Sequence, residues 1–248
     1  MLSSKRKTKA VVSWWNGDYL ARLSTRDATK ELKILYENNH LLAVFKPAGL
    51  LTQGPARNQN TLIDIVKEWI KIKYEKPGNV YAGLIHRLDR PVAGVVLIAR
   101  TSKAASRLSK EMRERKIDKI YRAIVKGVPK NDEGVLEGYL RKRETDKKMI
   151  VFRTERKRTT YAKLSYKLIE TRNAKSLLQI TPETGRRHQI RALLAHAGIP
   201  VWGDCKYGSG PKLRGIIALL AHRITFSHPT KGKRITVESP IPPNWPWP

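Results

Sequence analysis

The chain has 248 residues, enough for one large domain or two small ones, and its 40% of hydrophobic residues predicts a folded globule rather than a disordered chain. Fifty Lys and Arg against 21 Asp and Glu give a net charge of +29, which indicates a polyanionic partner such as nucleic acid. An anionic membrane surface is the alternative, but no segment combines a basic face with the broad apolar face of a membrane-surface helix. The single cysteine, Cys205, excludes an intrachain disulfide and a cysteine-rich metal site, and no apolar run approaches the roughly 18 residues of a membrane span.

Residues 1–30 are predicted to form a basic N-terminal arm. Four cations between positions 5 and 9 precede a pair of tryptophans, Trp14 and Trp15, with no acidic residue before Asp18. Basic charge interleaved with aromatic rings suits contact with an RNA backbone and stacking on its bases. The alternatives are an organelle presequence and a solvated tail whose tryptophans pack on the domain.

Residues 34–50 are predicted to form a strand, a turn and a second strand, which a further turn over residues 46–49 closes. A helix over residues 61–73 follows, because apolar residues at positions 62, 65, 66, 69 and 70 fall on one helical face. Thr61 and Asp64 have the spacing of a capping box. The helix is expected to pack on the core.

Residues 83–100, GLIHRLDRPVAGVVLIAR, place one carboxylate among cations between two predicted buried strands. Leu84 lies in the first of these strands, and the β-branched run 95–99 forms the second. Pro91 and Gly94 mark the join as a turn. Side chains in such a turn are presented to a ligand by a rigid scaffold.

Four polar residues of this turn are candidate functional residues: His86, Arg87, Asp89 and Arg90. The two neighbouring guanidiniums favour the ionised form of the Asp89 carboxylate. An ionised aspartate can act as a nucleophile, as a general base or as half of a structural ion pair. The local pattern leaves these roles open.

Residues 103–116 are predicted to form a second amphipathic helix, with Leu108 and Met112 inward and cations outward. Outer charges usually only solvate a helix, but the excess of one sign here favours phosphate contact. Residues 120–125 alternate as a strand, which places Tyr121 on its apolar side or against a pocket. A lone tyrosine in a strand is more often a core residue.

The next segments predict an antiparallel sheet. Residues 141–158 hold nine Lys or Arg against three acids around the apolar run 149–152, which is typical of a hairpin with cationic ends. Residues 160–169 and 176–181 alternate polar and apolar side chains. Such a sheet has one wet face, rich here in lysine, which would suit RNA.

A helix is predicted from residue 186 to residue 197, closed by Gly198. Arg186, Arg187 and Arg191 crowd its N-terminal part, where the helix dipole is already positive. Such cations call for an anion, and both a phosphate and the carboxylate of Asp89 are candidates.

Two polar residues of this helix, His188 and Gln189, are interpreted as positioning residues. A metal site built from His188 and His196 is disfavoured, since eight residues separate them and no acidic third ligand is at hand.

The last predicted strands cover residues 215–226 and 235–237, with Ile217 and Leu219 on the same side of the first. A Pro- and Trp-rich tail over residues 241–248 is expected to wrap the surface. The elements predict an α+β fold, a mixed and mainly antiparallel central sheet with flanking helices, in a domain covering residues 31–240.

Several of these segments resemble, in the same order, the motifs of the RluA-type pseudouridine synthases, which isomerise uridine in RNA. HRLDRPVAG at residues 86–94 resembles the family signature HRLD-x-x-(T/S)-(S/A)-G. The family's opening segment, second conserved strand, third motif and closing segment are matched by residues 34–50, 119–127, 184–208 and 218–229. The resemblance implies the pseudouridine synthase fold, without the S4-type RNA-binding domain that many relatives carry.

The resemblance also implies roles for individual residues. Asp89 is the catalytic carboxylate, Tyr121 stacks on the target base and Arg191 pairs with Asp89. Leu219 lines the uracil pocket, and Arg87 fills the gap that the flipped base leaves. The remaining candidates for contact with RNA are His86, Arg90, Arg186, Arg187, His188 and Gln189.

Three positions depart from the family pattern. Val92 and Ala93 replace the usual threonine and serine, and Leu220 stands where relatives have a histidine. We expect activity to survive because the aspartate is retained, although no role of that imidazole can be carried over.

The implied reaction moves uracil from its N1 to its C5 linkage without redox chemistry or net hydrolysis, so we expect no cofactor and no metal. One carboxylate near C1′ suffices, by attack on the sugar, by abstraction of the 2′ proton or by addition to C6. A base within a helix must be flipped out to react.

We therefore expect a monomeric isomerase that modifies specific uridines, in ribosomal rather than transfer RNA, with a ribosomal assembly intermediate as a candidate form of that RNA. The expected location is the cytoplasm, with a mitochondrion or other organelle as the alternative. One rival function is a catalytically inactive RNA-binding or ribosome-assembly protein of the same fold. The other is a metal-dependent nuclease, which is disfavoured because the sequence lacks the clustered carboxylates that such an enzyme needs.

Overall fold

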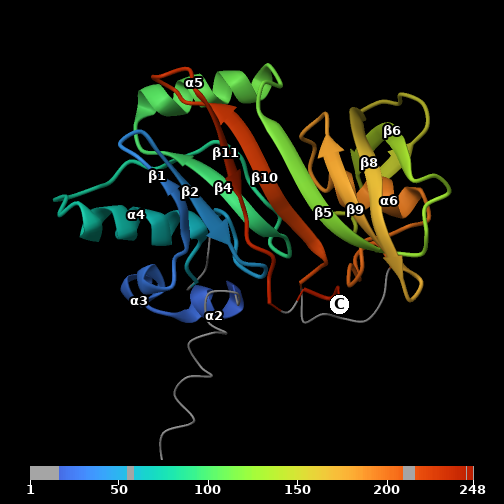
Figure 1. Ribbon diagram of the computed structural model, residues 1–248, viewed down its shortest axis with the longest axis horizontal. Helices are drawn as coiled ribbons and strands as arrows, with labels where there is room; N and C mark the ends of the chain where they lie inside the picture. The colour runs from blue at the N-terminus through green and yellow to red at the C-terminus, as the bar shows by residue number, and fades with distance from the viewer. Residues whose placement is uncertain (1–16, 55–58, 209–215, 244, 248) are drawn as a thin grey trace, which may run out of the picture. The chain divides into compact units, whose positions relative to one another are not determined.

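The computed structural model describes residues 17–54, 59–208, 216–243 and 245–247. Contacts within the chain divide it into two compact units. The first comprises residues 1–117 and 223–242, and the second comprises residues 118–222 and 243–248 (Figure 1). Helices accompany antiparallel strand pairs in both units, which confirms the predicted α+β fold with a mainly antiparallel sheet.

Buried strands form the centre of the first unit. In this unit β1 (Ile34–Glu37), β2 (Leu41–Lys46) and β4 (Ala93–Ala99) are neighbours in that order, and β3 (Gly83–Leu84) pairs with the end of β4. All residues of β2 and β4 are buried. Strand residues point alternately to opposite faces. One face of β2 and β4 therefore packs in a single core with α5 (Ser102–Arg113), the end of β10 (Leu219–Ser227) and β11 (Arg234–Glu238).

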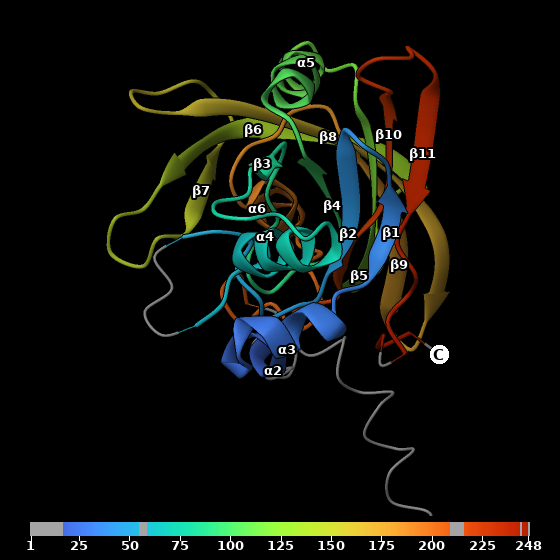
Figure 2. The same cartoon turned by 90° about the vertical axis from the view of Figure 1, so that its left-hand side faces the viewer.

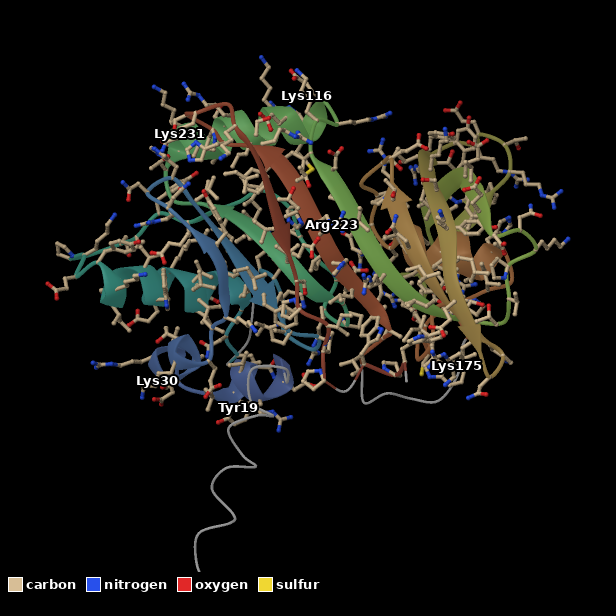
Figure 3. All side chains as sticks on the ribbon, viewed as in Figure 1. Tyr19, Lys30, Lys116, Lys175, Arg223 and Lys231 are labelled. Atoms are coloured by element: carbon tan, nitrogen blue, oxygen red, sulfur yellow. The ribbon has the colours of Figure 1, made fainter. Side chains whose placement is uncertain are left out.

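The two predicted helices of the first unit are confirmed. α4 (Leu62–Lys73) begins after Thr61, whose backbone N–H and hydroxyl both donate to Asp64, at 3.0 and 2.6 Å. α5 begins after Thr101, whose hydroxyl accepts from the backbone N–H of Ala104 at 3.2 Å. Its outer side carries exposed cations, and Figure 3 shows Lys116 just beyond its end. No helix among the described residues is long and apolar enough to span a membrane.

The part of the predicted N-terminal arm that the structure describes is helical. Residues 17–30 form α2 (Gly17–Arg22) and α3 (Thr25–Lys30), and α3 lies against α4 (Figure 2). Tertiary contacts account for these short helices. The amide of Gly17 donates to the carbonyl of Ala48 at 3.0 Å, and a Cβ on Gly17 would lie 2.2 Å from the amide nitrogen of Leu50, so only glycine fits. Residues 1–16, with Trp14 and Trp15, lie outside the described part of the chain.

In the second unit β5, β9, β8, β6 and β7 are neighbours in that order, each antiparallel to the next, and the first residues of β10 also belong to this unit. Their bounds are β5 (Asp118–Lys126), β6 (Glu133–Lys142), β7 (Met149–Phe152), β8 (Thr160–Arg172) and β9 (Lys175–Pro182). The strands predicted at 120–125, 149–152, 160–169 and 176–181 are thereby confirmed, and β6 and β7 form the predicted cationic hairpin.

Two predicted boundaries in this unit are wrong. The helix expected from residue 186 is α6 (Gln189–His196), because His188 has a left-handed backbone with a φ of 51° and the Gln189 side chain holds the preceding loop in a turn. Arg186 and Arg187 therefore precede the helix instead of crowding its first turn. The strand expected from residue 215 begins at Leu219. In the C-terminal tail, the indole N–H of Trp247 donates to Glu170 of β8 at 3.1 Å.

Candidate active site

Asp89 is presented by a tight turn in the first unit. The carbonyl of Asp89 accepts from the amide of Val92 at 3.0 Å, which closes the turn just before β4. The preceding residue, Leu88, is buried, and Thr52 holds its backbone from both sides: the Thr52 hydroxyl donates to the Leu88 carbonyl at 2.8 Å and accepts from its amide at 3.3 Å. Asp89 itself is half-buried. Asp89 is thus a partly exposed residue on a backbone that hydrogen bonds hold at residues 88 and 89.

Lys46 lies beneath this turn and was missed by sequence reasoning. The side chain is completely buried at the end of β2, and its ammonium nitrogen donates to the carbonyls of Pro47 at 2.9 Å, Leu50 at 2.7 Å and Arg90 at 3.3 Å. Burial lowers the pKa of Lys46 to about 7, and the negative charge of Asp89 opposes this shift. The sequence offers one signal, a lysine that ends a fully apolar strand directly before a Pro-Ala-Gly turn.

The cations that flank Asp89 in the sequence have different surroundings. Arg90 donates from Nε to the Gly49 carbonyl and from Nη2 to Asp18 of α2, both at 2.8 Å, so it fastens the turn to its neighbours. A ring nitrogen of His86 accepts from the backbone amide of Leu97 at 3.2 Å, which ties the motif to β4. Arg87 is exposed. The RNA contacts assigned to His86, Arg87 and Arg90 stay predictions.

In the second unit, Tyr121 lies on β5 and is half-buried, opposite Ile180 of β9. Leu219 is buried at the start of β10, next to Ala218, whose carbonyl accepts from the amide of Ile124 at 2.9 Å. The strand and side predicted for Tyr121 agree with this placement, whereas base stacking by Tyr121 and the pocket role of Leu219 remain predictions.

Arg191 has a partner that the sequence did not reveal. Its Nε and Nη2 donate to the two carboxylate oxygens of Asp204, at 2.6 and 2.8 Å, and the side chains are only 5% and 1% exposed. A bidentate pair of this kind is the geometry that makes burial of two charges tolerable. Asp204 therefore fixes the plane of the Arg191 guanidinium. The pairing of Arg191 with Asp89 stays a prediction.

Gln189 and His188 hold the loop that precedes α6. The side-chain oxygen of Gln189 accepts from the hydroxyl of Thr184 at 2.6 Å and from the amide of Arg186 at 3.1 Å, while its nitrogen donates to the Lys163 carbonyl at 3.0 Å. His188 Nδ1 lies 3.0 Å from the hydroxyl of Tyr207. These contacts hold the loop in place, and the roles expected for His188 and Gln189 in positioning the substrate or binding RNA stay predictions.

The remaining two arginines of this motif lie on the surface. Arg186 donates from Nε to the carbonyl of Tyr161 at 3.1 Å, and Arg187 is exposed. Across the described parts of the chain, no three His, Cys, Asp or Glu side chains gather closely enough to hold a metal ion.

Residues 40–196 match the model of a protein family described as RNA pseudouridylate synthase. The chain belongs to the RNA pseudouridine synthase family. The matched span contains Asp89, Tyr121 and Arg191, and the reaction class of the family is an isomerisation of uridine in RNA. This pseudouridine synthase is therefore an enzyme of the class that its sequence motifs predicted.

Curated relatives point to the same family. The chain is 34% identical over 217 residues to an uncharacterized RNA pseudouridine synthase of Aquifex aeolicus, covering 84% of this chain and 68% of the relative. It is 31% identical over 235 residues to the ribosomal large subunit pseudouridine synthase C of Buchnera aphidicola, covering 88% and 71%. The ribosomal large subunit pseudouridine synthase D of Pseudomonas aeruginosa is 30% identical over 233 residues, covering 88% and 70%.

Solved structures support the fold. Human RNA pseudouridylate synthase domain containing 4 superposes with a TM-score of 0.75 at 22% identity, covering 89% of this chain and 94% of that one. Human RNA pseudouridylate synthase domain containing 1 gives a TM-score of 0.69 at 21% identity, covering 86% and 85%.

Proposed function

We propose that this pseudouridine synthase converts specific uridines of ribosomal RNA to pseudouridine, with Asp89 as the catalytic carboxylate. The observation that carries the proposal is the turn at Asp89, whose backbone is anchored by Thr52 and by the buried Lys46 while residue 89 itself stays partly exposed. Ribosomal RNA is favoured over other RNA because relatives at 30–31% identity are named ribosomal large subunit pseudouridine synthases.

The reaction exchanges one bond for another within a single nucleotide. The N1–C1′ bond of uridine breaks, the freed uracil turns in place, and a C5–C1′ bond forms. C5 then gives up its proton, and N1 ends with one, so that atoms balance without a cofactor. Asp89 acts near C1′ or C6, and a rigid backbone keeps its oxygen at the reacting atom, which lowers the entropic part of the barrier.

The second unit supplies the other side chains assigned to the reaction. Tyr121 provides an aromatic face that replaces the stacking lost when the target base leaves a helix, a loss of a few kcal/mol. Arg191, whose guanidinium is held in a fixed plane by Asp204, is the cation that the family resemblance assigns to the catalytic carboxylate. Phosphate contacts from the basic surface offset the cost of base flipping.

Loss of the C5 hydrogen gives a direct test of the reaction. Ribosomal RNA labelled with tritium at C5 of uridine is expected to release tritium to water with the wild-type protein and not with Asp89→Asn. Asp132→Asn, which changes an exposed carboxylate of the second unit, is the matched control and is expected to retain turnover. Fluorescence anisotropy with the same RNA checks that Asp89→Asn still binds.

Turnover by Asp89→Asn would show that another group carries the chemistry. RNA binding without tritium release by the wild-type protein would instead favour a catalytically inactive RNA-binding protein of the same fold. Mapping of pseudouridines in cells with and without the gene would then identify the modified position.

A further inference from the structure

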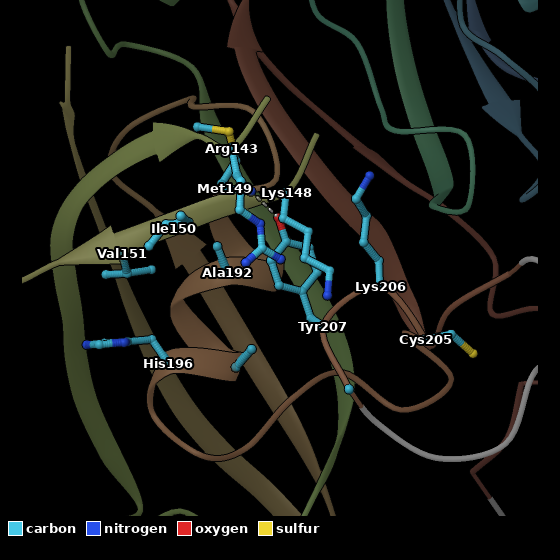
Figure 4. A pocket seen from close by; sticks show the side chains of 12 residues that line it. Arg143, Lys148, Met149, Ile150, Val151, Ala192, His196, Cys205, Lys206 and Tyr207 are labelled. Carbon is cyan, nitrogen blue, oxygen red and sulfur yellow. Dashed lines mark hydrogen bonds between the residues drawn. The ribbon is translucent and has the colours of Figure 1, made fainter. Parts of the chain in front are cut away.

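An open pocket of about 380 Å³ lies in the second unit, and none of the roles above involves it (Figure 4). Three segments build it: the β6–β7 hairpin, the side of α6 that carries Ala192 and His196, and residues 205–208. Its volume falls in the range of pockets that hold small organic groups. The pocket is therefore large enough to accept part of a nucleotide.

Cations dominate the rim of this pocket. Arg143, Lys148 and Lys206 line it, and the nearby acid of the hairpin is Asp146. Asp146 accepts from Arg143 Nε at 2.9 Å and from the backbone amide of Lys148 at 3.1 Å, and the Lys148 ammonium lies 3.8 Å away. One carboxylate thus orders two cations and leaves an excess of positive charge.

Lys206 is the cation of the rim that is not directly paired with Asp146, whose charge acts on it only from a distance. It forms no ion pair within 4 Å with any residue that the structure describes. Partial burial lowers the pKa of Lys206, the charges of Arg191, Arg187 and Lys148 lower it further, and the charge of Asp146 opposes this shift only in part. Positive charge has accumulated here beyond what the protein itself compensates, and a bound anion would relieve the repulsion.

The pocket wall is rigid and continues to residues assigned to the reaction. The hydroxyl of Tyr207 accepts from the amide of Met149 at 2.9 Å and lies 3.0 Å from Nδ1 of His188. The guanidinium carbon of Arg191 lies 5.2 Å from the centre of the Tyr207 ring. Ala192, which follows Arg191 on α6, lines the pocket. A group bound here would therefore lie one side-chain layer from Arg191.

We propose that this pocket binds a nucleotide of the substrate RNA adjacent to the target uridine, with the phosphodiester on Lys148 and Lys206 and the sugar or base against Met149 and Tyr207. The inference rests on the proposed function for its choice of RNA as the ligand. An open pocket suits a polymer, whose chain must enter and leave, and the fixed wall gives one linkage of the strand a defined place beside Arg191.

Neutral linkages test the contact with the phosphodiester. A short single-stranded RNA with one central uridine is prepared as a series, each member carrying a methylphosphonate at one linkage. The wild-type protein is expected to lose about fivefold or more in affinity at one linkage near the uridine, because a charge contact disappears there. Lys148→Ala/Lys206→Ala is expected to bind the unmodified RNA about tenfold more weakly and to show no loss at that linkage.

The matched control is Lys126→Ala/Lys130→Ala, which removes two exposed lysines of the same unit outside the pocket. This control variant is expected to show the same loss of affinity as the wild type when the sensitive linkage carries a methylphosphonate. The proposal is overturned if Lys148→Ala/Lys206→Ala remains sensitive at the same linkage, or if the control loses that sensitivity equally.

The protein's single cysteine gives a second measurement that needs no variant. Cys205 is exposed and lines the pocket. Alkylation of the Cys205 thiol by N-ethylmaleimide is expected to slow at least fivefold when unmodified RNA is bound. The slowing is expected to be smaller when the bound RNA carries a methylphosphonate at the sensitive linkage. Equal alkylation rates with and without bound RNA would refute the site. Absence of tritium release by the wild-type protein would refute the proposed function alone, since both readouts here measure binding.

Discussion

Lys46 shows how far a single side chain can depart from its usual chemistry. Lysine is almost never fully buried unless it is paired, yet Lys46 is completely buried and satisfied by three backbone carbonyls. Two of these carbonyls belong to the loop that follows β2, at residues 47 and 50, and the third belongs to residue 90 in the Asp89 turn. The lysine therefore acts as an internal brace for the segment that presents the candidate catalytic carboxylate.

The depressed pKa of Lys46 predicts a pH dependence of stability. Its pKa is about 7 in the folded protein and near 10.5 when unfolded, so the unfolded chain binds more protons between these values and stability rises with pH across this window. Lys46→Met removes this titration. Between pH 7 and about pH 9.5, the free energy of unfolding of the wild type should gain roughly 1–3 kcal/mol relative to the variant.

Urea unfolding at the two pH values measures this difference. Lys67→Met, which changes an exposed lysine on α4, is the control and should follow the wild type. A parallel pH dependence for Lys46→Met and the wild type would mean that Lys46 titrates normally.

The buried pair of Arg191 and Asp204 predicts strong coupling between two substitutions. Asp204→Ala leaves the guanidinium of Arg191 without its buried carboxylate and should lower the free energy of unfolding by about 3–5 kcal/mol. Arg191→Met/Asp204→Ala removes both charges and should be clearly more stable than Asp204→Ala, while tritium release is lost. Additive losses in this double-mutant cycle, followed by urea unfolding, would contradict a direct buried pair.

At the scale of elements, the loop before α6 depends on one side chain. The Gln189 side chain forms hydrogen bonds with Thr184, Arg186 and Lys163. The loop that it holds stands where the sequence predicted the first turn of the helix. Gln189→Leu removes these hydrogen bonds, one of them from the buried hydroxyl of Thr184, and should cost about 1–3 kcal/mol. Hydrogen exchange should quicken in residues 184–188.

Gln179→Leu is the control, because Gln179 is a half-buried glutamine on β9. Mass spectrometry of exchanged peptides should show no change in residues 184–188 for this variant. An unchanged exchange rate in Gln189→Leu would assign the loop's order to other contacts.

The sequence predicted those helices and strands whose signals, a capping box or a repeated apolar pattern, lie within a single segment of the chain. The capping box at Thr61 and Asp64 and the alternation around Tyr121 are each contained within one segment. Helix α2 was not predicted, because its start depends on the close approach of Gly17 to residue 50. These residues are more than thirty positions apart in the sequence. Asp204 escaped for the same reason: thirteen residues separate it from Arg191, and only the fold brings them together.

The net charge of the chain predicts the class of partner without the help of any motif. A net charge of +29 implies that RNA affinity depends steeply on salt. For about six contacted phosphates on single-stranded RNA, affinity should fall a few hundredfold between about 50 and 200 mM salt. Anisotropy titrations over this range measure the slope, and an affinity independent of salt would refute phosphate contact as the main source of binding.

The division into two units was less accessible from sequence than the family was. Motifs spread over the chain suggested one domain for residues 31–240, and no composition change marks residues 117 or 222. The two units are defined by the contacts between their residues, and these contacts depend on the pairing of strands that are far apart in the sequence.

The path of the chain through the two units sets a delay during protein synthesis. The core of the first unit includes Ile224, Phe226 and Val237, which the ribosome adds only after the 105 residues of positions 118–222. At typical translation rates that interval lasts roughly 5–20 s. For that time the nascent N-terminal portion lacks the strands that cover Leu41 and Leu97, so these apolar side chains stay uncovered until β10 and β11 have been synthesised.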